Sequence, residues 1–333
     1  MLKRNISILL VLAFICGPIF IISQGYYNRY EYRRKRNEIS FGGGASNFLG
    51  ELGGRDMVGS NFLWDLEFAK TSYVGQFSYV YYAQAKVAIR ANLCYAKVSG
   101  DDALTNEYFR HNRNLNFESN IIEGAVMLEI HLKNERSGNR YNLRSPAGRY
   151  LGVKSSIGLG VYTFVGVGGF YFNPYGHAPS GQKYALKPLS TEGQGLPGGA
   201  MAYSNVSGCI PLGFGVRKAF FGDAGIKVEA SYRFTFTDYI DDVSTVYYNN
   251  DVLKQVYGQA AGTMADPSLG ITFIDGANNI STHTETGMQR GDPSDDDGYL
   301  FATVSVYKKF TNSAGGYNRS FKTQQRRRVK ASF

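Results

Sequence analysis

Four histidines are the side chains of this sequence best suited to acid–base chemistry near neutral pH, and they stand far apart: His111, His131, His177 and His283. None has a second histidine or a cysteine at the spacing of a zinc site. A hydrolytic site needs a histidine beside a serine and a carboxylate. His111 and His283 have aspartates nearby in polar segments, as most polar loops do. An enzyme built on these two histidines is therefore the least favoured hypothesis for the function of this chain, and we predict no catalytic residue.

A run of carboxylates over 292–298 offers the oxygen ligands that calcium prefers. It holds Asp292, Asp295, Asp296 and Asp297, but it lacks the twelve-residue loop pattern and its terminal glutamate. We interpret the run as a solvated acidic turn, and we predict no metal and no other cofactor.

The first residues predict export from the cytoplasm. Two basic residues precede an apolar stretch over 6–22, and small residues that suit cleavage follow it. We interpret residues 1–24 as a signal peptide, with a retained membrane anchor as the alternative. Cys94 and Cys209 remain beyond it without paired spacing, so we expect two free thiols rather than a disulfide framework.

The stretch Gly225–Tyr239 shows which kind of element positions the polar groups of this chain. Apolar side chains at every second position, from Ile226 to Phe236, alternate with charged and polar ones such as Lys227 and Arg233. Successive side chains of a β-strand point to opposite faces, so this strand has one apolar and one charged face. Its length suits the ~9–11 residues with which a tilted strand crosses a bilayer.

Seven further segments alternate in the same way, and the connections between them include short turns and long polar loops. An even number of strands, short turns at one end and long loops at the other are typical of bacterial outer-membrane barrels. We predict an all-β fold, an eight-stranded antiparallel transmembrane β-barrel over 39–310 with long extracellular loops. The tails 25–38 and 311–333 would lie in the periplasm, and a short helix is expected over 251–261. A soluble sandwich or lipocalin-like barrel is the alternative. The expected strands are 39–48, 73–82, 87–97, 121–132, 156–172, 209–220, 225–239 and 299–310.

If the apolar faces meet lipid, the polar faces fill the interior of the barrel. An eight-stranded barrel is just wide enough for side chains, and acids and bases are mixed there, so we predict ion pairs and a plugged barrel. Arg233 is expected to pair with Glu123 or Glu129. Inward glycines would leave room for large neighbours such as Tyr162 and Phe164. The predicted interior charges are Arg90, Glu123, Glu129, Arg217, Lys227, Glu229 and Arg233, with His131 beside them.

Charge is strongly segregated along the chain, whose formal net charge is +9. Basic residues outnumber acidic ones by five to two in 25–38, by six to one in 133–155 and by six to none in 311–333. The loop 237–298 holds eleven acids and two bases. In the predicted topology the basic segments face the periplasm. There an acidic protein, a lipid headgroup or a cell-wall polymer is a better partner than nucleic acid.

Several stretches give the chain a family resemblance. They are ELGGRDMVGSNFLWDL at 51–66, VSGDDA at 98–103 with RNLNF at 113–117, LSTEGQGLPG at 189–198, YRFTFTDYIDDVS at 232–244 and RGDPSDDDGYLFATVSVYKKF at 290–310. With them, residues 39–310 resemble a family of outer-membrane barrels from the Bacteroidetes group, whose named member is PorG of the type IX secretion system. The resemblance implies an accessory of type IX protein secretion that contacts a periplasmic ring formed by PorK and PorN. It carries over no catalytic residue, and the basic segments 133–155 and 311–333 depart from the family pattern.

The sequence therefore predicts a non-enzymatic outer-membrane barrel, surrounded by outer-membrane lipids, that docks a periplasmic ring of type IX secretion through basic segments. The alternative is a small porin or surface-binding barrel unrelated to secretion. Neither a nucleic acid nor a small-molecule substrate is expected as a partner. The residues expected to dock the ring are Arg136, Arg140, Arg144, Arg149, Arg326, Arg327, Arg328 and Lys330.

Overall fold

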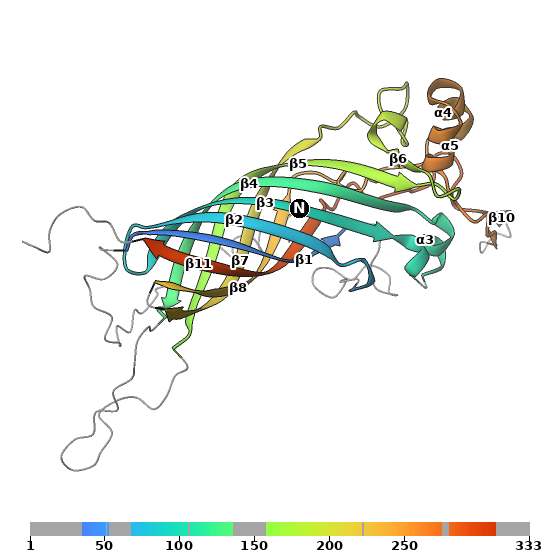
Figure 1. Cartoon of the computed structure of the whole chain (residues 1–333). Coiled ribbons are helices and arrows are strands. Elements are labelled where there is room, and N and C mark those ends of the chain that lie inside the picture. The colour runs from blue at the N-terminus through green and yellow to red at the C-terminus, as the bar shows by residue number, and fades with distance from the viewer. Residues whose placement is uncertain are drawn as a thin grey trace, which may run out of the picture.

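A closed β-barrel with small helices at one end makes up the described part of the chain (Figure 1). The predicted signal peptide, 1–24, and the tail 311–333 lie outside the described residues, as do most of 25–38 and 133–155. The computed structural model describes residues 35–50, 52, 68–105, 107–135, 158–221, 223–274 and 280–310.

Eight long strands form the barrel, and each is antiparallel to its two neighbours. They are β1 (Asn37–Leu49), β2 (Ser72–Tyr82), β3 (Val87–Asp101), β4 (Asn116–Lys133), β5 (Gly160–His177), β7 (Val206–Phe221), β8 (Ala224–Thr235) and β11 (Gly298–Phe310). Strands that follow one another in this series are paired, and β1 closes the ring against β11, with Asn37 opposite Phe310. The predicted fold class is confirmed: this is an eight-stranded antiparallel barrel of the outer-membrane type.

All eight predicted segments are strands, although β7 begins three residues before 209 and β8 ends at Thr235 rather than at 239. Three other strands run four or five residues further toward the long loops than predicted. β3 extends to Asp101, β4 begins at Asn116 and β5 extends to His177. Polar residues dominate the outer face of these extensions, so the apolar alternation stops while the hydrogen-bonded ladder continues. The barrel wall therefore rises above its apolar band on this side.

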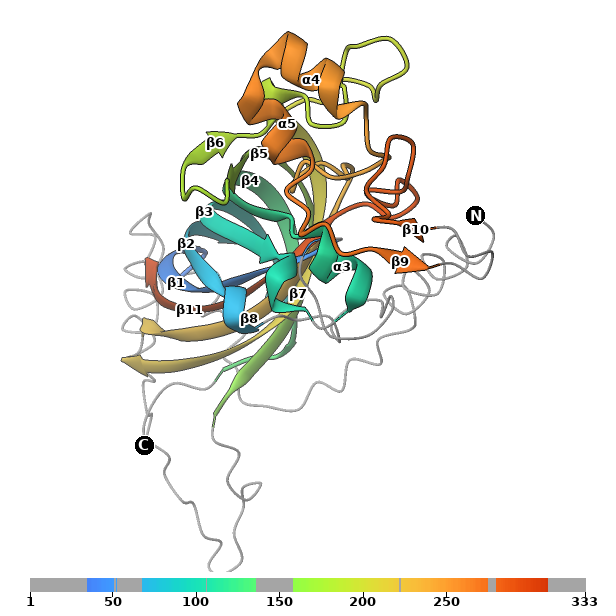
Figure 2. The same cartoon turned by 90° about the vertical axis from the view of Figure 1, so that its right-hand side faces the viewer.

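The long loops fold into small elements at one end of the barrel. They are η2 (Phe68–Lys70), η3 (Asp102–Leu104), α3 (Tyr108–Arg113), β6 (Lys183–Ala185), η4 (Lys187–Leu189), α4 (Asn250–Tyr257), α5 (Gln259–Ala265), β9 (Phe273–Ile274) and β10 (Ile280–Ser281). Figure 2 looks onto this end, with α3 and the α4–α5 pair standing around the mouth. A short helix is present where one is predicted over 251–261, but α4 ends at Tyr257 and a second helix, α5, follows Gly258, whose φ of 91° breaks the helical path. Among the described residues, no helix is long and apolar enough to cross a membrane.

The barrel buries its polar side chains and displays its apolar ones. Phe41 is 71% exposed and Val167 is 68% exposed on the outer wall. The residues that alternate with such outward ones along each strand face inward, as Arg90 of β3 and Glu123 of β4 do. In water, each such outer side chain would forgo ~1.5–3 kcal/mol of burial free energy. The outer wall therefore suits a lipid environment, and the closed sheet excludes the two-sheet sandwich.

Candidate functional site

The interior of the barrel holds buried ion pairs in three layers, and the first lies near the short turns. Glu38 is completely buried there and receives Nη2 of Arg217 at 2.6 Å and Nζ of Lys227 at 2.5 Å. The hydroxyl of Tyr82 donates to the same carboxylate at 2.8 Å. Three donors from three strands thus satisfy one carboxylate, so the charge of Glu38 is compensated without water.

Glu135 follows β4 and turns back over the same end of the barrel. Its Oε1 lies 3.1 Å from Nη2 of Arg217 and 2.6 Å from Nζ of Lys309, and Tyr307 donates to its Oε2. Arg217 stands on β7 and Lys309 at the end of β11, so this carboxylate joins β7 and β11 to the segment after β4. Glu135 therefore closes the interior at the short-turn end.

The second layer centres on Arg90. Its guanidinium pairs with Glu129 and, through Nη2, with Oε1 of Glu229 at 2.6 Å. Glu229 also accepts from the hydroxyl of Tyr162 and from Nε2 of Gln76, the latter at 3.1 Å. An arginine has five N–H donors in a planar fork, which lets Arg90 of β3 hold a carboxylate from the neighbouring β4 and one from β8 across the interior.

The third layer lies toward the long loops. Nε of Arg233 is 3.1 Å from Oε2 of Glu123, and the hydroxyl of Tyr299 donates to that oxygen at 2.9 Å. The guanidinium also lies 3.9 Å from the ring centroid of Phe301, a cation–π contact. Of the two partners expected for Arg233, the structure places Glu123 beside it.

All seven residues proposed for the interior charge network lie inside the barrel and are buried. His131 joins them, with Nε2 3.3 Å from Oε2 of Glu129. The sequence pattern assigns Glu38 to the N-terminal tail and Glu135 to the basic connection, so neither is among the predicted interior charges. One signal was available for Glu38, which precedes the outward Ile39 and so must face inward. The paired interior groups are balanced, five acids (Glu38, Glu123, Glu129, Glu135, Glu229) against five bases (Arg90, Arg217, Lys227, Arg233, Lys309).

Loop residues form a second buried network over the mouth, which we call the cap. Nη1 of Arg290 lies 2.9 Å from Oε1 of Glu192 and donates to the backbone carbonyl of Asp242 at 2.7 Å. The carboxylate of Asp242 accepts from the hydroxyls of Thr191 at 2.6 Å and Tyr203 at 2.5 Å. Apart from Tyr203, these residues belong to the stretches 189–198, 232–244 and 290–310. Three of the stretches that carry the family resemblance therefore meet in the cap.

Burial changes the proton affinity of the cap. It raises the pKa of Asp242 to about 6, although Arg290 and the hydroxyls of Thr191 and Tyr203 favour the ionised form. The ring of Tyr203 stacks on that of Tyr239, with centroids 4.5 Å apart and planes 7° apart. The cap is thus a packed structure whose one perturbed carboxyl group titrates near neutral pH.

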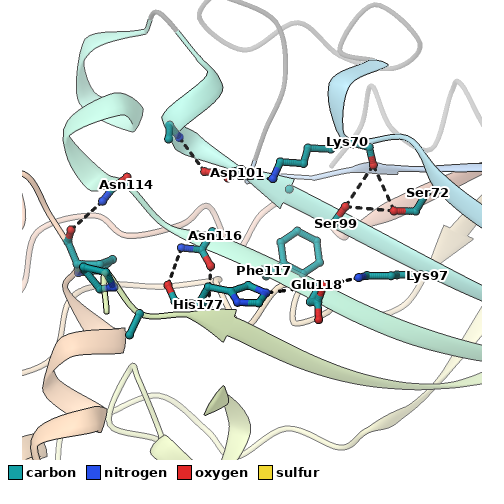
Figure 3. Close-up of a pocket in the computed structure, with 15 residues that line it drawn as sticks. Lys70, Ser72, Lys97, Ser99, Asp101, Asn114, Asn116, Phe117, Glu118 and His177 are labelled. Atoms are coloured by element: carbon teal, nitrogen blue, oxygen red, sulfur yellow. Dashed lines mark hydrogen bonds and ion pairs between the residues drawn. The ribbon is translucent and has the colours of Figure 1, made fainter. Parts of the chain in front are cut away.

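A pocket of about 490 Å³ opens in the outer wall beside the mouth (Figure 3). Lys97 from β3 and His177 from β5 point toward Glu118 of β4, and Nζ of Lys70 lies 2.9 Å from Oδ2 of Asp101. Serine and asparagine side chains line it further, together with apolar residues such as Phe117, Pro179 and Pro267. The pocket therefore carries both signs of charge beside an apolar part of its lining.

The histidines and the acidic run 292–298 have structural contacts in the part of the chain that the structure describes. His283 packs by its ring against Phe109, 5.0 Å between centroids, while His131 and His177 stand in the interior and at the outer pocket. Asp297 accepts the backbone N–H of Ile240 at 2.8 Å. Across the described ranges, no group of three or more His, Cys, Asp or Glu side chains could hold a metal ion.

The basic residues expected to dock a periplasmic ring cannot be placed, because each lies outside the described residues. They are Arg136, Arg140, Arg144, Arg149, Arg326, Arg327, Arg328 and Lys330.

No family model and no curated protein matches this chain. Solved outer-membrane proteins do match, at low identity. The attachment invasion locus protein Ail of Yersinia pestis, in complex with sucrose octasulfate, is 8% identical over 83% of this chain and 99% of that one, with a TM-score of 0.34. OprG of Pseudomonas aeruginosa is 8% identical over 84% and 98%, with a TM-score of 0.32. AlkL in lipid bilayers is 10% identical over 89% and 100%, also with a TM-score of 0.32. Likenesses this distant bear on no ligand or activity of this chain.

Proposed function

We propose that this chain is a non-enzymatic outer-membrane barrel that serves type IX protein secretion by docking a periplasmic ring assembly. The observation that carries the proposal is the interior. Five acids and five bases are paired there, and Glu135 closes the short-turn end. A barrel filled in this way has no room for a permeant solute, so its function lies on its surfaces and in its connections.

The arrangement of the strand ends supports docking at one side of the membrane. β1 begins at Asn37 opposite Phe310, where β11 ends, and β4 ends at Lys133 opposite Val161 of β5. The three basic segments, 25–38, 133–155 and 311–333, therefore join the barrel at the same end. The acidic loop 237–298 belongs to the other end, where α4 and α5 stand (Figure 1). Basic segments joined to the periplasmic end of the barrel suit an acidic partner, since charge complementarity steers association.

The family resemblance supports the choice of partner. It names a ring of PorK-like and PorN-like proteins, and three of its stretches converge on the buried cap through Glu192, Asp242 and Arg290. The docking role itself is assigned to Arg326, Arg327 and Arg328 together with the connection 133–155.

Pull-down of the ring proteins from solubilised membranes tests this role. One variant lacks 311–333, and a second carries glutamine at Arg136, Arg140, Arg144 and Arg149. We expect each variant to recover less of the ring and their combination to recover least. A control with lysine at the same four positions keeps the charge and should recover the ring normally. Undiminished recovery by the combined variant contradicts the docking proposal.

A second candidate, a surface-binding barrel unrelated to secretion, is favoured by the pocket beside the mouth. Its mixed lining with charged groups and its volume of about 490 Å³ suit a ligand from outside the cell. Protein secretion in a strain without the gene separates the two, because a surface-binding barrel predicts unchanged secretion.

A further inference from the structure

The outer wall changes character in ordered steps between the lipid-facing band and the pocket beside the mouth. On β3 the outward residues run from Leu93 through Tyr95 to Lys97, and on β4 from Ile122 through Asn120 to Glu118. Successive outward residues of a strand are ~6.6–6.8 Å apart. Apolar, intermediate and ionic side chains thus follow one another over about 13 Å along each strand.

Tyrosines mark the boundary between the band and the pocket. Tyr73 of β2 and Tyr95 of β3 lie side by side, with ring centroids 6.3 Å apart, and Tyr171 of β5 stands opposite Ile122 of β4. All three tyrosines are exposed on the outer wall. Tyrosine and tryptophan collect at the membrane–water interface of such barrels. The pocket therefore begins where lipid acyl chains end.

Positive groups gather around one carboxylate of the pocket, that of Glu118. The ammonium groups of Lys97, which lines the pocket, and of Lys183, which stands beside it on β6 opposite His177, both contact Glu118. Nε2 of His177 lies 3.8 Å from Oε2 of Glu118. The side chains of Lys97 and Lys183 are 30% and 43% exposed, so both can be reached from outside. An ammonium has three N–H donors, and Glu118 uses only part of them. Two cations are thus held close together with donors to spare.

We propose that this pocket binds the phosphorylated sugar headgroup of a glycolipid in the outer leaflet. Phosphate would take the free donors of Lys97 and Lys183. The volume of the pocket, about 490 Å³, is larger than a lone phosphate needs, and the side chains of Ser99 and Asn116 offer partners for sugar hydroxyls. The acyl chains would lie on the apolar band below Tyr95. The proposal rests on membrane insertion with the long loops outside, and it is independent of any role in secretion.

Lipid retention in nanodiscs, read by native mass spectrometry, tests the pocket. The probes are a bis-phosphorylated lipid A and its dephosphorylated form, each diluted in phosphatidylcholine. The test variant is Lys97→Gln with Lys183→Gln. We expect its apparent affinity for the phosphorylated lipid to fall by about 10- to 30-fold, since each cation near an anionic headgroup contributes substantially. Lys254→Gln is the matched control, because Lys254 is 36% exposed and also pairs with a carboxylate, but stands on α4. Its retention should stay unchanged.

A third variant is expected to change lipid retention in the opposite direction. Glu118→Gln keeps the shape of the side chain and removes the charge that competes with phosphate, so we expect tighter retention of the phosphorylated lipid. Weaker retention by Glu118→Gln would mean that a bridging cation, rather than the lysines, recognises the lipid. Equal retention of the two lipids, or an unchanged Lys97→Gln/Lys183→Gln variant, overturns the proposal. If soluble glucosamine phosphate displaces the phosphorylated lipid completely, the pocket binds a free sugar phosphate, and the lipid as the source of the ligand is overturned. The heat-induced gel shift of a folded barrel verifies that each variant is folded.

Discussion

Arg233 of β8 and Glu123 of β4 meet inside the barrel, Nε to Oε2 3.1 Å, although β5 and β7 separate their strands in the wall. The pair therefore spans the interior and ties two non-adjacent strands together. Both side chains are buried, so neither charge can turn to water. A buried pair contributes little beyond a well-packed apolar replacement, but breaking it leaves an uncompensated charge.

Removing one member of this pair should destabilise the barrel strongly, and removing both should cost less than the sum. We expect Arg233→Met to lower the free energy of unfolding by about 3–5 kcal/mol, because Glu123 is then buried without its cation. Adding Glu123→Gln should recover part of this loss. Denaturant unfolding in detergent micelles measures the three variants as a double-mutant cycle. Lys308→Met, on the exposed outer wall, is the control, and purely additive losses would contradict the coupling.

Glycine at 213 should be indispensable for packing the interior. A Cβ at this position would lie 2.6 Å from Cζ of Phe164 and 2.6 Å from the carbonyl oxygen of Ala230, which is backbone and cannot move aside. We expect Gly213→Ala to destabilise the barrel by about 1–3 kcal/mol through overpacking. Gly75→Ala is the matched control on the outer wall, where the nearest atom, the carbonyl oxygen of Tyr95, is 4.0 Å away. Equal stability of the two variants would refute this account of the interior.

The purified barrel should carry no steady ionic current. Ion pairs around Arg90, Arg217 and Arg233 fill the interior, and an ion would have to break them to pass. Planar-bilayer recordings measure the current, with an open porin in the same bilayer as the positive control. A reproducible unitary conductance would favour the porin alternative over a docking barrel.

The membrane-facing part of this fold could be predicted from the sequence because apolar and polar residues alternate strictly along its strands. On β8, Val228 and Phe234 face outward while Lys227 and Arg233 face inward, as expected from period-two spacing. The interior charges followed from the same spacing. Which of them pair did not follow, because partners such as Arg233 and Glu123 depend on the curvature and stagger of the closed barrel.

The two ends of the barrel were predicted less well, for the reason that alternation fails there. Asp101 and His177 lie on strands whose outer faces have left the apolar band, so their strand ends carried no signal. Glu135 lies beyond β4 and reaches the interior only through a turn of the chain. The cap pair of Glu192 and Arg290 joins loops 98 residues apart, a contact that no local pattern encodes.

Burial in the cap disfavours the ionised form of one carboxyl group, that of Asp242. Burial raises the pKa of Asp242 to about 6 from 3.8, while Arg290 and the hydroxyls of Thr191 and Tyr203 oppose the shift. The folded state therefore binds this proton more tightly than the unfolded state does. Its contribution to stability is full below pH 3.8, falls as the pH rises through about 6, and is lost above that value.

Acidification should consequently tighten the cap, and Asp242→Asn should remove that response. We expect cap stability to decrease by on the order of 2–3 kcal/mol between about pH 4 and pH 7, since one pKa unit corresponds to about 1.4 kcal/mol. Hydrogen exchange of the backbone amides of Ser244 and Thr245, which donate to Glu192, reports this stability after correction for intrinsic exchange rates. Asp251→Asn, at a side chain 86% exposed on α4, should leave the slope unchanged. A slope that survives in Asp242→Asn would assign the response to another group.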